Sequence, residues 1–104
     1  MSNNKLLSML GLAKKAGKLS LGHDAVMESI ARGKAQAVIL AADASDRLER
    51  EIKREIAFQN SMATLIRTKH TMAEIGTALP HKVGVVSVND ASFAQAVLKI
   101  FEED

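Results

Sequence analysis

The sequence predicts an α/β fold, a three-layer α/β/α sandwich with a central mixed sheet of about four strands. Three observations indicate this class. Segments with apolar residues at helical spacing alternate with short apolar segments of strand length along the whole chain. Residues 18–43 show the pattern of a βαβ unit: an alternating run, a turn at Gly22, a helix that stops at Gly33, and a second strand. That second strand, residues 37–42, is apolar throughout, as is typical of a central strand with helices on both faces.

The first half of the chain supplies four elements. We expect a helix over residues 5–16, a short edge strand over 18–21, a helix over 22–32 and the central strand over 37–42. The two helices are predicted because Leu6, Leu10 and Ala13 share one face of the first, and Val26 and Ile30 share one face of the second.

The second half supplies five more. We expect a helix over residues 47–58, a strand over 62–66, a short helix up to 79, a strand over 83–88 and a terminal helix. Asp46 and Glu49 resemble a capping box, and Thr71 and Glu74 form a clearer one before a helix that Pro80 ends. Asn89, Asp90 or Ser92 caps the terminal helix.

The bulk composition is that of an ordinary soluble domain. At 104 residues, with 47% apolar and 25% charged residues, we expect residues 1–104 to form a single domain. The chain has no cysteine, which excludes disulfides and a thiolate nucleophile. It has no apolar run long enough to cross a bilayer and no secretory leader pattern, so we expect a cytoplasmic protein without a membrane partner.

Enzyme motifs are missing. The sequence contains neither GxxxxGK[ST] nor GxGxxG, and its histidines, His23, His70 and His81, lack the spacing of metal ligands. His23 and Asp24 are adjacent, and neighbours at a helix start rarely face each other as a catalytic dyad does. We therefore expect no catalytic residue, no metal, no cofactor and no small-molecule substrate.

The distribution of charge favours nucleic acid. The net charge is only +2, but every charged residue before Asp24 is a lysine. Two loops, 18–24 and 67–70, each follow a strand and precede a helix, so we expect both at the carboxyl ends of the strands, on one edge. A helix entered through Gly22 also offers unpaired backbone N–H groups to phosphate. The predicted RNA contacts are Lys14, Lys15, Lys18, Gly22, His23, Asp24, Lys34, Arg67, Thr68, Lys69 and His70.

The scarcity of aromatic residues indicates which nucleic acid. With no Trp, no Tyr and three Phe, the chain lacks platforms on which single-stranded bases stack. A structured RNA recognised by shape, phosphates and 2′-hydroxyls fits better.

Ordinary structural roles remain open for the same residues. Gly22 can be a permissive turn, and the lysines can be solvated charges or partners of helix dipoles. A rival function is a protein-interaction module of the same fold, which would dock through the mixed-charge helix 47–58.

Several motifs resemble a known family. The run LGLAKKAGK at residues 10–18, then Gly22, the run RGKA at 32–35, the strand that ends at Asp43, and EIGTA at 74–78 resemble the bacterial YlxQ-type branch of the ribosomal L-seven-Ae family. The resemblance implies the α/β/α sandwich and a ribosome-associated RNA-binding protein without catalysis. Family members that bind kink-turn RNA use the start of the second helix and the loop before the fourth.

The chain departs from those kink-turn binders at three positions. Asp24 stands where they have Asn, Ala25 where they have Glu, and Glu28 where they have Lys. Pro80 also stands where many members have Gly. Asp24 keeps an acceptor, but Glu28 replaces a cation with an anion. A protonated His23 near phosphate would recover part of the lost attraction, so binding would tighten below neutral pH.

Overall fold

Helices and strands alternate from one end of the chain to the other. The computed structural model describes residues 5–103. The elements are α1 (Lys5–Lys15), β1 (Leu19–Leu21), α2 (His23–Ala31), β2 (Ala37–Leu40), α3 (Asp46–Phe58), β3 (Thr64–Arg67), α4 (Met72–Ala78), β4 (Val85–Val88) and α5 (Ala91–Glu103). Each predicted element is present, and its ends lie within two residues of the predicted ones. The outermost residues of the predicted domain, 1–4 and 104, lie outside the described part of the chain.

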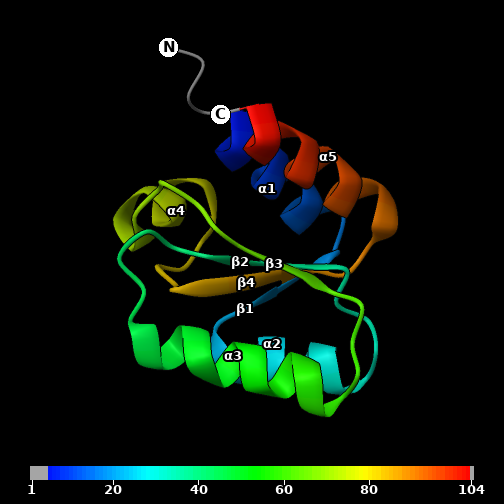
Figure 1. Ribbon diagram of the computed structural model, residues 1–104. Helices are drawn as coiled ribbons and strands as arrows, with labels where there is room; N and C mark the ends of the chain where they lie inside the picture. The colour runs from blue at the N-terminus through cyan, green and yellow to red at the C-terminus, as the bar shows by residue number, and fades with distance from the viewer. Residues whose placement is uncertain (1–4, 104) are drawn as a thin grey trace.

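The four strands form one mixed sheet in the order β1-β4-β2-β3. β4 is antiparallel to both β1 and β2, and β2 is parallel to β3, so β1, β2 and β3 all run in one direction. Helices α2 and α3 cover one face of the sheet, and α1, α4 and α5 cover the other (Figure 1). The predicted three-layer sandwich with a mixed sheet of four strands is thereby confirmed.

The predicted βαβ unit is present, and a third strand separates its two strands in the sheet. β1 and β2 are parallel, but β4 lies between them and pairs with both. β4 comes from the last fifth of the sequence. The pattern of residues 18–43 carries no signal for this insertion, because strand pairing depends on segments far apart in sequence.

The core lies on both faces of the two central strands. Every residue of β2 and of β4 is buried, and the helices add fully buried side chains to each face, among them Leu10, Val26 and Ile52. Burying an aliphatic side chain of this size contributes roughly 1.5–3 kcal/mol. The central position predicted for the strand that begins at Ala37 is confirmed.

The helix caps are settled by side-chain contacts. Thr71 Oγ1 accepts from the N–H of Glu74 at 3.2 Å, and Glu74 Oε1 accepts from the N–H of Thr71 at 2.9 Å, which confirms that capping box. The box predicted at Asp46 is wrong, because Ser45 caps α3 by accepting from the N–H of Leu48 at 3.0 Å. The three candidates before α5 reduce to Asp90, whose carboxylate accepts from the N–H of Phe93 at 2.9 Å.

The strand directions divide the connecting segments between two ends of the sheet. Segments that follow β1, β2 and β3 lie at the carboxyl end, and segments that precede these strands lie at the amino end. The carboxyl end is held together by backbone bonds from Gly22 to Val85 and from Ala42 to His70, of 2.9 and 2.8 Å. We call residues 22–24, 41–43 and 68–70 together the carboxyl-end rim.

No helix within residues 5–103 is both long enough and apolar enough to span a bilayer.

Candidate nucleic-acid interface

The entry to α2 is open. Gly22 has φ 89°, a left-handed conformation that a side chain would strain, and it is the N-cap without any side-chain hydrogen bond. The first backbone bond into the helix runs from Val26 N–H to Gly22 C=O at 3.0 Å. Within residues 5–103, the backbone N–H groups of residues 23–25 make no hydrogen bond. Three donors at the positive end of a helix dipole are therefore available to an anion.

Asp24 stands beside these donors. Its side chain is fully exposed. A carboxylate in the first turn of a helix is stabilised by the helix dipole, and it accepts hydrogen bonds but cannot donate them. The turn therefore combines backbone donors with a side-chain acceptor.

His23 connects the start of α2 to α3. Its Nδ1 lies 2.8 Å from Asp24 Oδ1, and its Nε2 lies 3.0 Å from Glu51 Oε1. Because carboxylates only accept, both contacts form when both ring nitrogens carry protons. The hydrogen bond to Asp24, and then that to Glu51, raise the pKa of His23 above its usual value.

The sequence-based expectation for His23 and Asp24 was therefore wrong, since the two neighbours do face each other. The pair is still no catalytic dyad. Carboxylates occupy both ring nitrogens, so neither nitrogen remains to take a proton from a nucleophile.

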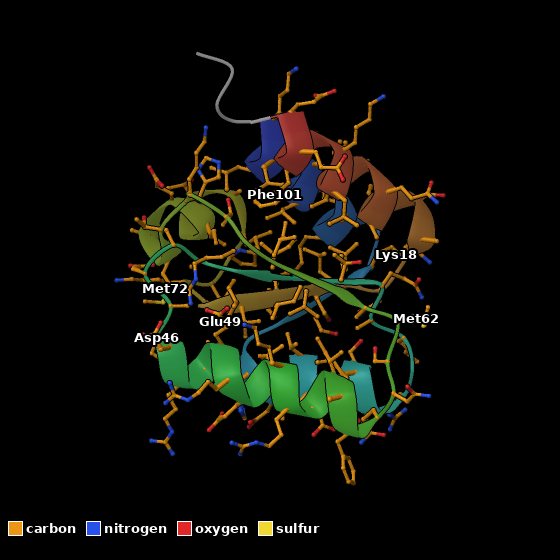
Figure 2. The ribbon with its side chains drawn as sticks, viewed as in Figure 1. Lys18, Asp46, Glu49, Met62, Met72 and Phe101 are labelled. Atoms are coloured by element: carbon orange, nitrogen blue, oxygen red, sulfur yellow. The ribbon has the colours of Figure 1, made fainter. Side chains whose placement is uncertain are left out.

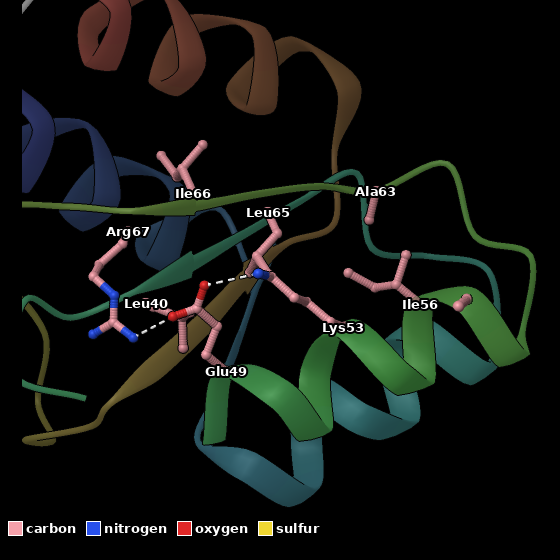
Figure 3. A pocket seen from close by; sticks show the side chains of 9 residues that line it. Leu40, Glu49, Lys53, Ile56, Ala63, Leu65, Ile66 and Arg67 are labelled. Carbon is pink, nitrogen blue, oxygen red and sulfur yellow. Dashed lines mark hydrogen bonds and ion pairs between the residues drawn. The ribbon is translucent and has the colours of Figure 1, made fainter. Parts of the chain in front are cut away.

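Arg67 is used inside the protein (Figure 3). Its Nη1 donates to the carbonyl oxygens of Ala41, Ala42 and Ala44 at 3.1, 3.2 and 2.9 Å, and its Nη2 donates to Glu49. Arg67 first and Lys53 second hold the pKa of Glu49 below its usual value. The expectation that Arg67 holds phosphate is corrected, because its guanidinium already ties β3 to the loop after β2 and to α3.

Two more residues of the predicted loop are buried. Thr68 is 3% exposed and accepts from the N–H of His70 at 3.3 Å, and His70 is 5% exposed. The Nδ1 of His70 lies 3.6 Å from Glu74 Oε1, and its buried Nε2 has no hydrogen-bond partner. Neither side chain is therefore placed to contact RNA, contrary to the prediction. Of residues 67–70, only Lys69 is exposed.

The expected convergence of Lys18 with Lys69 is also wrong. Lys18 precedes β1, whereas Lys69 follows β3, so the two lie at opposite ends of the sheet. Figure 2 shows Lys18 across the molecule from Asp46 and Met72, which mark the carboxyl end. The other predicted lysines, Lys14, Lys15 and Lys34, also precede β1 or β2 and belong to the amino end.

The carboxyl-end rim and its surroundings are rich in acid instead. The carboxylates in this region are Asp24, Asp43, Asp46, Glu49, Glu51 and Glu74. Glu49 pairs with Arg67, Glu51 pairs with His23, and Asp43 Oδ1 accepts from the N–H of Met72 at 2.9 Å. The predicted contacts therefore form two groups: Gly22, His23, Asp24 and Lys69 at one end, and the four lysines at the other.

Sequence reasoning missed the polar residues that accompany those lysines. Arg32 lies beside them and pairs with Glu28 at 3.0 Å, and Asn89, noted only as a possible cap, is hydrogen-bonded to three serines. No local sequence signal would have found them, because Asn89 comes beside Lys18 only through the pairing of β4 with β1. Within residues 5–103, no group of three or more His, Cys, Asp or Glu is arranged to hold a metal ion.

Comparisons with known proteins bear on this arrangement. The model of the family described as "Ribosomal protein L7Ae/L30e/S12e/Gadd45 family" matches residues 4–98. No curated protein matches the chain.

Two solved structures share the fold. A protein of unknown function from Bacillus halodurans C is similar with a TM-score of 0.82 and 25% identity over 96% of this chain and 99% of its own. The Giardia lamblia 15.5kD RNA binding protein is similar with a TM-score of 0.65 and 22% identity over 94% of this chain and 82% of its own.

Proposed function

The chain belongs to the ribosomal protein L7Ae/L30e/S12e/Gadd45 family, and on that premise we propose that it binds structured RNA and catalyses no reaction of its own. The proposed target is a kinked RNA, ribosomal in origin, bound in the cytoplasm. The RNA-binding activity named for the Giardia lamblia protein of the same fold supports this proposal.

One observation carries the proposal: the uncapped start of α2 at the carboxyl-end rim. Three backbone donors and the exposed carboxylate of Asp24 stand together there. Backbone N–H groups hold phosphate oxygens without reading sequence, whereas a carboxylate accepts from base amino or imino groups. The turn can therefore bind the phosphates of a bent RNA backbone and contact the edge of an unpaired base in the same place.

Two cations moderate the acidity of this surface. His23 is the imidazolium when both of its carboxylate contacts are made, and Lys69 is exposed at the same end of the sheet. Protonation of His23 adds positive charge beside the three donors, so RNA binding should tighten as pH falls through its raised pKa.

The acceptor role of Asp24 gives a direct test. Fluorescence anisotropy with a ribosomal RNA fragment that contains a kink-forming internal loop would be measured for the Asp24→Ala and Asp24→Asn variants. Loss of the acceptor in Asp24→Ala should weaken binding about 10-fold. Asp24→Asn keeps an acceptor, removes a negative charge and should bind at least as tightly as the unmodified chain.

Asp46→Ala is the matched control, because Asp46 is also an exposed acid in the first turn of a helix at this end. It should change affinity less than about 2-fold. Equal tightening in Asp24→Ala and Asp24→Asn would mean that only charge matters and would refute the acceptor role. Absence of binding to every ribosomal fragment at low salt would reject the RNA proposal itself.

A protein-docking function is the second candidate, and exposed apolar side chains favour it. Phe58 at the end of α3 is 80% exposed and Met62 is 94% exposed. A hollow of about 360 Å³ lies between α3 and β3, lined in part by Ile56 and Leu65 (Figure 3). Affinity capture before and after complete nuclease digestion separates the two functions, because a partner retained without RNA must bind protein.

A further inference from the structure

We infer that the amino end of the sheet carries a second RNA-binding surface, one that takes the phosphate backbone of a regular duplex. We call Lys14, Lys15, Lys18, Arg32 and Lys34 the amino-end basic face. The inference rests on the proposed function for the identity of the polyanion, but its location is given by residues that the carboxyl-end rim does not use.

The end of β4 brings these cations together. The N–H of Asn89, directly after β4, donates to the C=O of Lys18 at 2.8 Å, and the N–H of Gln36 donates to Val88 C=O at 2.8 Å. The segments that hold Lys18 and Lys34 therefore flank the end of one strand. Lys14 and Lys15 form the last turn of α1, which runs into β1 through the left-handed Gly17 at φ 73°.

This face has few opposing charges. The carboxylates at this end are already engaged, since Glu28 pairs with Arg32 at 3.0 Å, Asp90 caps α5, and Glu55 in the last turn of α3 accepts from Gln59 at 2.8 Å. Within residues 5–103, none of the four lysines forms an ion pair. Lys15, Lys18 and Lys34 are exposed. A polyanion that docks here displaces no internal partner of a lysine, and the gain comes from release of its counterions.

A polar hollow bordered by hydrogen-bonded side chains lies within the amino-end basic face. Its volume is about 200 Å³, and the polar residues that line it include Ser20, Asn89, Arg32, Lys34 and the acidic Glu28. Asn89 Oδ1 accepts from the hydroxyls of Ser29 and Ser87 at 2.7 and 2.9 Å, and Asn89 Nδ2 donates to Ser20 Oγ at 2.9 Å.

This network fixes the direction of the hydroxyl groups. Ser20 Oγ receives a hydrogen bond, and within the described residues its own hydrogen has no acceptor, so the hydroxyl remains a donor for a ligand. A serine hydroxyl and a lysine ammonium at one hollow match the oxygens of a phosphate group, and a phosphate that enters it competes with Glu28 for the guanidinium of Arg32.

The occupant is a regular duplex for two reasons. Lysine ammonium groups act as point charges that neutralise phosphates irrespective of sequence, which suits a uniform backbone. The face also lacks the features of the other end, an open helix N-terminus with an acceptor for an unpaired base. One protein can therefore hold the kink of an RNA at the carboxyl-end rim and a helical segment at the amino-end basic face.

The test uses a plain RNA duplex of about 16 base pairs, long enough to span two successive minor grooves. Its affinity for the full chain would be measured by anisotropy over a series of salt concentrations. In the double variant Lys18→Gln/Lys34→Gln, the slope of log K against log salt should become shallower by about 2. Affinity at low salt should fall at least about 10-fold.

The matched control is Lys53→Gln/Lys82→Gln, which removes the same charge from exposed lysines outside the face. It should leave the slope and the affinity close to those of the unmodified chain. An equal effect in both double variants would show that only net charge matters, and would overturn the inference. Failure of the duplex to bind at low salt would also overturn it.

A second measurement separates this inference from the proposed function. Adding duplex to a preformed complex with a kinked RNA whose helical arms are too short to reach the amino-end basic face should give a ternary complex in sedimentation, because the two faces are at opposite ends of the sheet. Displacement of the kinked RNA would show a shared face and overturn the inference alone. If Lys18 and Lys34 govern duplex binding while Asp24 does not affect kinked RNA, the proposed rim is wrong and the inference stands.

A separate result would show that a protein, and not RNA, binds the amino-end basic face. If the Lys18→Gln/Lys34→Gln variant loses a protein partner in nuclease-treated extract and keeps full duplex affinity, the face belongs to a protein interface and the inference is overturned.

Discussion

Replacing Arg67 by Met should destabilise the protein strongly without weakening RNA binding. The guanidinium holds the carbonyl oxygens of Ala41, Ala42 and Ala44 between β2 and α3, and those oxygens lie in a partly buried loop. Met keeps most of the apolar stem but offers no donor, so the carbonyls lose their partner. Arg67 thus serves the fold, contrary to its predicted contact with phosphate.

The size of the effect follows from the number of protons. Nη1 carries two hydrogens for three carbonyl oxygens, so about two full hydrogen bonds to the loop are lost, and the bond from Nη2 to Glu49 is lost with them. At roughly 1.5 kcal/mol for each of the two loop bonds from a charged donor, the free energy of unfolding should fall by at least about 3 kcal/mol. For a domain of this size, that corresponds to a Tm lower by about 12–24 °C.

The assay is urea unfolding followed by far-ultraviolet circular dichroism, because the chain has no Trp or Tyr to serve as a fluorescence probe. Lys53→Met is the matched control, since Lys53 pairs with the same Glu49 from an exposed position on α3. It should change the unfolding free energy by less than about 0.5 kcal/mol. If Arg67→Met is as mild as the control, or if folded Arg67→Met loses RNA affinity, the assignment of Arg67 to the fold is refuted.

Two further changes test individual side chains. Thr71→Ala removes the cap of α4 and should cost about 1 kcal/mol, whereas Thr77→Ala, in the same helix, should cost less because Ala has the higher helix propensity; equal thermal shifts for the two variants would contradict the capping role. For His23, whose pKa is raised in the folded state, the stabilising contribution is fully present below the unfolded value of 6.5 and is lost as pH rises through the folded one. His23→Gln should therefore lower the free energy of unfolding by a few tenths of a kcal/mol near pH 5.5 and by less near pH 9. The effect is small because the ring is 46% exposed. A loss of stability that does not change with pH would show that neither carboxylate contact depends on protonation.

The fold could be predicted because its signals are local. The 3.6-residue spacing of apolar side chains located the helices, and the unbroken apolar run from Ala37 located the central strand. The position of β4 could not be predicted in this way. Its sequence reads as a buried strand, but no property of residues 85–88 says which neighbours it pairs with.

The site could be predicted only in part. Gly22 carries a conformational signature that a sequence reveals, and the structure has it at positive φ. Partners far away in the sequence decide which residues of a polar loop turn inward. Arg67, for example, is drawn inward by Glu49 and by three carbonyl groups. The placement of Lys18 is different, because a residue before a strand lies at the other end from a residue after it.

The middle place of β4 constrains how the protein can be made. Until residues 85–88 leave the ribosome, β1 has no strand to pair with, and one edge of the most apolar strand stays open. A chain synthesised only as far as β3 can form the β2–β3 pair, but it leaves β1 and one edge of β2 without a partner strand, and unpaired strand edges favour association with other chains.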